Sequence, residues 1–177
     1  MPAMDAEMAI RDLIHRYAAA ADARDAAAMA RCFQPDAVLL TADGSAQGRA
    51  EIERRFAAFL SGELMGAEGS STHLIGNVMV EVNGRSATVW SQAVVVLAPA
   101  GTGYVHVRGI GYDDECVRTP VGWRFRQRQH RLLWQAQCAG GPVAPFLSSQ
   151  PRRVPGDPGR SVAVVVRLDS RGHVETE

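Results

Sequence analysis

The stretch that decides the fold is THLIGNVMVEVNGRSATVWSQAVVVLA, residues 72–98. Apolar and polar side chains alternate with a period of two on both sides of its centre, which is typical of strands with one buried face. Asn83-Gly84 separates the two runs, and this dipeptide favours a type I′ turn because both residues tolerate a positive φ. The stretch therefore predicts a long antiparallel hairpin.

A second hairpin is predicted directly after the first. YVHVRGIGYDDECVR, residues 104–118, and GWRFRQRQHRLLW, residues 122–134, are joined by the short loop Thr119-Pro120-Val121. Two successive long hairpins predict an antiparallel meander of four strands. Gly109 and Gly111 interrupt the side-chain row of the third strand, which indicates bulges or tight bends of the kind found in curved sheets.

The residues before the hairpins follow a helical period instead. Apolar side chains recur at i, i+3, i+4 and i+7 over residues 4–23, which predicts an amphipathic helix with Tyr17 facing the core. A short helix is predicted over residues 25–33, with Asp25 capping its first turn, and another over residues 49–60. A brief strand is predicted between them, over residues 37–41. Helices followed by a curved sheet define an α+β fold.

The composition excludes several classes of protein. The 177 residues carry 19 Lys plus Arg against 19 Asp plus Glu, and a net charge of zero gives no general attraction for nucleic acid or anionic membrane. We therefore expect no nucleic acid and no membrane as partners. Apolar runs fall short of the roughly 18 residues of a membrane span, and residues 1–17 lack the apolar core of a signal peptide. A soluble, cytoplasmic protein is expected.

Motifs for metals or disulfides do not stand out. Cys32, Cys116 and Cys138 are widely spaced and form no CxxC pair, so we expect reduced, structural cysteines. The 5 histidines show neither HxH nor HExxH spacing. The sequence thus predicts neither a metal site nor an organic cofactor.

The end of the chain has a different composition. Residues 140–159 are rich in Pro and Gly, which favours turns and extended linker over a packed element. SVAVVVRLDS, residues 161–170, predicts an added strand that pairs with a sheet edge of its own or of a neighbouring subunit. We therefore divide the chain into a domain over residues 1–139 and a C-terminal extension over residues 140–177, the latter serving as an edge strand or as a lid.

The order and spacing of these elements resemble the SnoaL-like branch of the nuclear transport factor 2-like superfamily. YAAAADARDAAAMARCFQPDA resembles its helix pair, GRAEIERRF its third helix, STHLIGNVMVEVNGRSATVWSQ its first long hairpin and GIGYDDECVRTPVGWRFRQR its final strands, together covering about residues 8–134. The resemblance implies a cone-shaped curved antiparallel sheet packed against three N-terminal helices, a cystatin-like α+β barrel with an internal pocket.

Within the superfamily, the sequence most resembles the scytalone dehydratase and hexachlorocyclohexane dehydrochlorinase group. That group uses an Asp near the end of the first helix and a His at the start of the first long strand as a catalytic pair, positions that Asp22 and His73 match. Arg118 matches an Arg that the dehydrochlorinase carries before its last hairpin turn. The second pocket His of scytalone dehydratase falls near Leu97, so specificity for a scytalone-like substrate is not implied.

Elementary chemistry gives the same pair a role. His73 is a candidate general base, because imidazole titrates near neutral pH and a carboxylate such as Asp22 on its other nitrogen would fix the tautomer. Alternation along the strands places further polar side chains on the same inner faces. The predicted substrate-binding side chains are Tyr17, Asn77, Tyr112 and Arg118.

Simpler interpretations remain open for some of these residues. By helical periodicity alone, Asp22 is a solvated residue in the last turn of a helix, and a lone His at a strand start is more often structural than catalytic. Arg124, Arg126, Arg128 and Arg131 form a basic run with His130, and the first three alternate with Trp123, Phe125 and Gln127. We interpret this basic run as a solvated strand face or a subunit contact, in preference to an RNA site.

The sequence as a whole predicts a cofactor-independent lyase or isomerase of the dehydratase or polyketide cyclase type. An Asp22–His73 dyad would remove a proton from a small apolar carbonyl or hydroxy-carbonyl substrate. The alternative is a non-catalytic ligand-binding or assembly protein of the same fold. An epoxide hydrolase is less well supported, because the Asp-Arg-Asp arrangement of that family is not evident. We expect a homodimer or homotrimer formed through the sheet.

Overall fold

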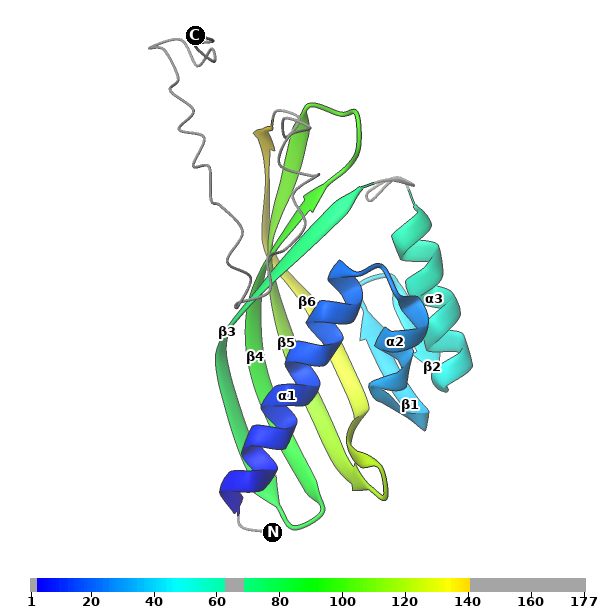
Figure 1. Cartoon of the computed structure of the whole chain (residues 1–177), viewed down its shortest axis with the longest axis vertical. Helices are drawn as coiled ribbons and strands as arrows, with labels where there is room; N and C mark the ends of the chain where they lie inside the picture. Colours follow the sequence, from blue (N-terminus) through cyan, green and yellow to red (C-terminus); the bar gives the residue numbers. More distant parts are fainter. Residues whose placement is uncertain (1–2, 63–68, 141–177) are drawn as a thin grey trace, which may run out of the picture. The chain divides into compact units, whose positions relative to one another are not determined.

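The computed structural model describes residues 3–62 and 69–140, and Figure 1 shows their arrangement. The helices in this part of the chain are α1 (Ala3–Asp22), α2 (Ala26–Arg31) and α3 (Arg49–Ser61). The strands are β1 (Phe33–Thr41), β2 (Gly44–Gln47), β3 (Ser70–Asn83), β4 (Ser86–Ala98), β5 (Tyr104–Thr119) and β6 (Gly122–Ala139). The predicted α+β class is confirmed.

The described strands form one sheet in the order β2-β1-β6-β5-β4-β3. The predicted meander is confirmed, since β3, β4, β5 and β6 pair in sequence order and antiparallel. The first part of the sheet differs from the prediction. β1 is longer than expected and pairs in parallel with β6, and it forms an antiparallel hairpin with β2, which was not predicted.

Helix α1 lies across one face of the long strands (Figure 1) and contacts β3 and β6. Its apolar stripe, including Ile10, Leu13 and Tyr17, is buried as predicted. These side chains join a core that also contains Phe33 of β1 and Phe125 of β6. One layer of helix on one layer of sheet therefore encloses the apolar side chains.

The turn between β3 and β4 differs in type from the prediction. Asn83 pairs with Ser86, so the two turn residues are Gly84 and Arg85. Of these two, Gly84 alone has a positive φ, +59°. A positive φ at the first turn position alone fits a type II′ turn, so the type I′ prediction is wrong although the hairpin is confirmed.

Two bulges lie on β6, not at the glycines of β5. The pairing of β5 with β6 shifts between Gly109 and Ile110 and again between Glu115 and Cys116, which leaves Leu133 and Arg126 of β6 as the extra residues. β5 itself pairs with β4 without interruption. Each extra residue reverses which side chains of β6 face the helices.

Helix α2 begins at a side-chain cap. The Asp25 side chain accepts a hydrogen bond of 2.8 Å from the Ala28 amide, so the predicted cap of the second helix is confirmed. That helix is shorter than expected, because Phe33 already begins β1.

Apart from Gly140, the predicted C-terminal extension lies outside the described residues. Among the helices that are described, none has both the length and the apolar character needed to cross a membrane.

Candidate active site

Asp22 ends helix α1 and faces the start of strand β3, where His73 lies. The Nδ1 atom of His73 is 2.6 Å from Oδ1 of Asp22, and the backbone amide of His73 donates to Oδ2 at 3.0 Å. Ser71 adds a hydroxyl bond of 3.0 Å to Oδ1. One carboxylate therefore fixes both the ring and the backbone of the same histidine, so the imidazole has a defined orientation.

The chain turns sharply between α1 and α2, and Arg24 forms the turn. Arg24 has a φ of +58°, in the left-handed region that few residues other than Gly and Asn adopt readily. Its guanidinium donates to the backbone oxygen of Gly69 at 2.7 Å and to that of Leu60. The end of α3 and the segment before β3 are thereby tied to the end of α1, which keeps Asp22 close to His73.

His73 lines a cavity of about 420 Å³ between the helices and the sheet. Its side chain is 12% exposed and that of Asp22 30%. A His73 ring whose Nδ1–H donates to Asp22 carries its lone pair on Nε2. Much of the cavity wall is apolar, and its polar side chains are Tyr17, Thr41, Asp43, Arg55, Ser71, His73, Arg108, Tyr112 and His130. This combination suits a small, mainly apolar ligand held by a few polar contacts.

His130 lines the cavity, although the sequence predicts it, with the rest of the basic run, on a solvated strand face or in a subunit contact. Its Nε2 lies 3.3 Å from the Tyr17 hydroxyl, and the Tyr112 ring meets its imidazole edge to face, with ring centroids 5.0 Å apart. Burial, with the Arg128 charge second, lowers the pKa of His130 to about 3. The ring is therefore neutral at physiological pH and serves as a hydrogen-bonding group, not as a cation.

Burial also determines the state of the two pocket tyrosines. It raises the pKa of Tyr17 strongly and that of Tyr112 to about 12, despite the opposing effect of Arg128. Both phenols are therefore protonated at neutral pH and can donate a hydrogen bond to an oxygen atom of a ligand.

Arg128 lies beneath these rings and corrects the interpretation of the basic run as a solvated face. It is buried, it is paired with Asp114, and its guanidinium carbon lies 4.3 Å from the ring centroid of Tyr17 and 4.4 Å from that of Tyr112. The bulge at Arg126 turns Arg128 inward, which simple alternation from Phe125 does not predict. Arg126, by contrast, is exposed as expected.

The four predicted substrate-binding residues divide into two pairs. Tyr17 and Tyr112 line the cavity with His73, whereas Asn77 and Arg118 are not among its lining residues. Asn77 has a φ of +49° at an irregularity in the β3–β4 register, and its amide donates to the Gln92 side chain at 3.3 Å. The expected shared face of His73 and Asn77 is therefore wrong, because the irregularity reverses the alternation after Gly76.

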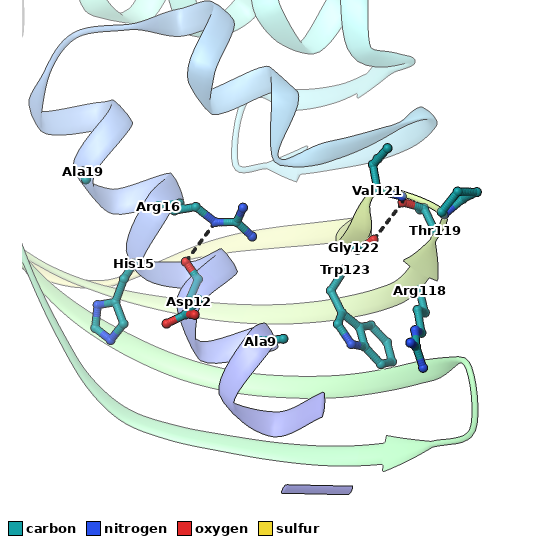
Figure 2. A pocket seen from close by; sticks show the side chains of 11 residues that line it. Ala9, Asp12, His15, Arg16, Ala19, Arg118, Thr119, Val121, Gly122 and Trp123 are labelled. Atoms are coloured by element: carbon teal, nitrogen blue, oxygen red, sulfur yellow. Dashed lines mark hydrogen bonds between the residues drawn. The ribbon is translucent and has the colours of Figure 1, made fainter. Parts of the chain in front are cut away.

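Arg118 lies by a separate hollow of about 680 Å³, formed by α1 and the β5–β6 turn. Figure 2 shows Arg118 and Trp123 across this hollow from Asp12 and Arg16 of α1. None of the residues that line it also lines the His73 cavity. Arg118 is thus on the inner face of β5 as expected but beyond the cavity, near the end of the strand.

The described residues offer no obvious place for a metal ion. Within residues 3–62 and 69–140, no group of three or more His, Cys, Asp or Glu side chains is close enough to hold one. The chemical groups that line the cavity are an imidazole with a bound carboxylate, two phenols, a neutral imidazole, two guanidinium groups, the Asp43 carboxylate and the hydroxyls of Thr41 and Ser71.

The chain matches the SnoaL-like domain over residues 2–129 and belongs to that family. Uncharacterized protein Rv2910c of Mycobacterium tuberculosis (strain ATCC 25618 / H37Rv) is 34% identical over 131 residues, which cover 71% of this chain and 84% of the relative. The family resemblance stated from the sequence is confirmed.

Solved structures agree with the fold. An NTF2-like protein with a cystatin-like fold from Novosphingobium aromaticivorans is 32% identical, with a TM-score of 0.61 over 73% of this chain and 83% of that one. A hexachlorocyclohexane dehydrochlorinase (LinA) Type2 has a TM-score of 0.69 over 80% of this chain and 95% of its own, at 18% identity. The curved sheet with N-terminal helices is thus the cystatin-like, NTF2-like fold.

Proposed function

We propose that the protein is a lyase or isomerase that needs no cofactor, with His73 as general base and Asp22 as the carboxylate that orients it. The observation that carries the proposal is the 2.6 Å contact between His73 Nδ1 and Asp22 Oδ1 at the wall of a cavity. A neutral imidazole held in this way presents Nε2 as the proton acceptor, and the adjacent carboxylate stabilises the imidazolium that forms.

The reaction that suits this site is removal of a proton from the carbon beside a carbonyl. Nε2 of His73 takes the proton, and the electrons of the C–H bond move onto the carbonyl oxygen. The electrons then return from the oxygen, a C=C bond forms and the C–O bond of the hydroxyl on the next carbon breaks. The leaving hydroxyl takes the proton from the imidazolium, so that water is released and the ring is again neutral. In a cyclase, the same enolate would attack a second carbonyl carbon instead.

The protonated phenols of Tyr17 and Tyr112 support the same reaction. Negative charge develops on the carbonyl oxygen during proton removal, and preorganised donors in a site shielded from water stabilise such an oxyanion. The tautomer of His130 that suits this role carries its hydrogen on Nε2 and donates to the Tyr17 oxygen, which leaves the phenol hydrogen available for the substrate. The dehydrochlorinase with the same fold is named for an elimination, which agrees with an elimination here.

The proposal is tested with purified protein and a panel of small β-hydroxy carbonyl compounds, with the unsaturated product followed by absorbance. We expect turnover by the wild type and a fall of at least about 100-fold in kcat for His73→Ala and Asp22→Asn. His15→Ala is the matched control, because His15 is an exposed histidine of α1 outside the cavity. Equal turnover by all four proteins would exclude the dyad.

We also infer that the outer face of the sheet joins copies of this chain in a homodimer or homotrimer. Leu74, Val94, Gly109 and Trp134 are successive register partners across β3, β4, β5 and β6. Leu74 is 62% exposed, Val94 37% and Trp134 49%. A continuous apolar row on one face is the kind of surface that a second subunit covers.

A further inference from the structure

A feature of the cavity that the proposed chemistry does not use is the charge of Arg108. This residue of β5 lines the cavity together with His73, Tyr112 and His130. Its Nε atom is enclosed and has no hydrogen-bond partner in the part of the chain that the structure describes. A buried N–H of a charged group without a partner is unfavourable. The guanidinium also forms no ion pair within residues 3–62 and 69–140, so its position on the cavity wall favours an anionic ligand.

The carboxylates on the same strand are already engaged by other arginines. Asp113 pairs with Arg131, Asp114 with Arg128 and Glu115 with Arg126. Asp43, on the cavity wall, has a favourable electrostatic effect on Arg108, yet the two form no ion pair within residues 3–62 and 69–140. Burial outweighs that effect, as well as the effect of Tyr112, and lowers the pKa of Arg108.

A second guanidinium, that of Arg55 on α3, reaches the same cavity. Its Nη2 donates to the Thr41 hydroxyl at 2.7 Å and its Nη1 to the Ser45 backbone oxygen at 3.5 Å, and both of these partners are neutral. Arg55, Arg108 and His130 all line this cavity, so both cations face one space. The charges of both arginines also act on His130. With Asp43 as the neighbouring anion, two positive charges meet one negative charge at this part of the wall.

We propose that Arg108, with Arg55 beside it, binds a carboxylate of the substrate, so that the substrate class is a carbonyl or hydroxy-carbonyl acid. A planar guanidinium binds a carboxylate through two parallel N–H bonds, which gives both affinity and orientation. The carboxylate would fix one end of the molecule, the apolar wall would hold its body and His73 would meet the carbon that loses the proton. The inference rests on the proposed function only in taking the His73 cavity as the substrate pocket.

The experiment measures binding without turnover. The probes are 3-phenylpropanoate and its primary amide, which have nearly the same shape and differ in charge, and affinities are measured by isothermal titration calorimetry. We expect the acid to bind wild type at least tenfold more tightly than the amide does. Arg108→Gln should weaken binding of the acid at least tenfold and leave binding of the amide unchanged. Arg108→Lys keeps the charge and should weaken binding of the acid by a smaller factor.

Two further variants separate this inference from the catalytic proposal. His73→Ala should bind the acid as the wild type does, because the base is not needed for binding. Arg55→Gln should weaken binding of the acid by a smaller factor than Arg108→Gln does. It also provides a test of the inference if the Arg108→Gln protein does not fold. Equal affinity for acid and amide, no detectable binding of the acid, or unchanged affinity in the arginine variants would overturn the inference. Loss of turnover in His73→Ala with binding intact would leave both proposals standing.

Discussion

The guanidinium of Arg128 is bound by both oxygens of Asp114, with Nε 2.8 Å from Oδ1 and Nη2 2.7 Å from Oδ2. Asp114 on β5 and Arg128 on β6 are register partners. The Asp114 side chain is 0% exposed and that of Arg128 is 1% exposed. Asp114→Ala would leave a buried charge without its partner, and we expect it to lower the free energy of unfolding by about 3–5 kcal/mol. Urea denaturation measures this loss.

The matching experiment removes both charges. A double variant with Asp114→Leu and Arg128→Leu leaves no unpaired ion and should recover much of the stability lost in the single variant, because apolar groups of similar volume replace a buried ion pair at little cost. A single-variant loss under about 1 kcal/mol would contradict the view that this pair is shielded from water.

His130 should make the protein less stable in acid. The unfolded chain protonates this ring near pH 6.5, whereas the folded protein keeps it neutral down to about pH 3. The unfolded state therefore binds more protons between these values, so the free energy of unfolding falls as the pH drops below 6.5. At pH 5 we expect His130 to lower the free energy of unfolding by about 2 kcal/mol relative to neutral pH.

His130→Gln should remove this contribution. Urea denaturation at pH 7 and pH 5 should show a smaller pH-dependent loss for His130→Gln than for wild type. His15→Gln, at an exposed position, should behave as wild type. The same pH-dependent loss in all three proteins would show that the folded protein protonates His130 as readily as the unfolded chain does.

The apolar row on the outer face of the sheet predicts the effect of a charge. Trp134→Glu places a carboxylate at one end of the row that contains Val94 and Leu74. We expect it to shift the assembly to monomers, as measured by light scattering after size exclusion. Gln129→Glu adds the same charge at an exposed position of β6 outside the row and should leave the assembly unchanged. A wild type that is monomeric at high concentration would refute the proposed interface.

Gly109 gives a sharper steric prediction. A Cβ atom at this position would lie 2.3 Å from Nε1 of Trp134 and 2.4 Å from its Cε2, far inside contact distance. Gly109→Ala should therefore displace the indole and lower stability by about 1–3 kcal/mol. Because the clash is with one side chain, adding Trp134→Ala should remove most of the extra cost of Gly109→Ala, which a double-mutant cycle measures.

Much of the fold was readable from the sequence, because the two hairpins and the amphipathic first helix have strong periods. The approach of Asp22 to His73 came from the family resemblance, since helical periodicity alone placed Asp22 toward solvent. β2 and the parallel pairing of β1 with β6 were missed, because β2 is only 4 residues long and parallel pairing depends on contacts distant in sequence.

The pocket wall on β6 could not be predicted by alternation. Counting back from the Thr119–Gly122 pair without a bulge places Gln127 opposite Asp114, whereas the extra residue Arg126 places Arg128 there instead. A basic side chain is usually assigned to solvent. The signal that was available is the run of acids at residues 113–115 facing a run of arginines across one hairpin, which favours the register that pairs them.

The bulge at Arg126 also has an evolutionary consequence. Deletion of the Arg126 codon would join Phe125 directly to Gln127 and remove the bulge, while Gln127 would stay opposite Glu115 and Arg128 opposite Asp114. One residue inserted or lost at this point therefore changes the length of β6 but leaves the charged and aromatic wall of the cavity as it is. Alignments that space residues evenly along this strand would match inward side chains of one protein with outward side chains of another.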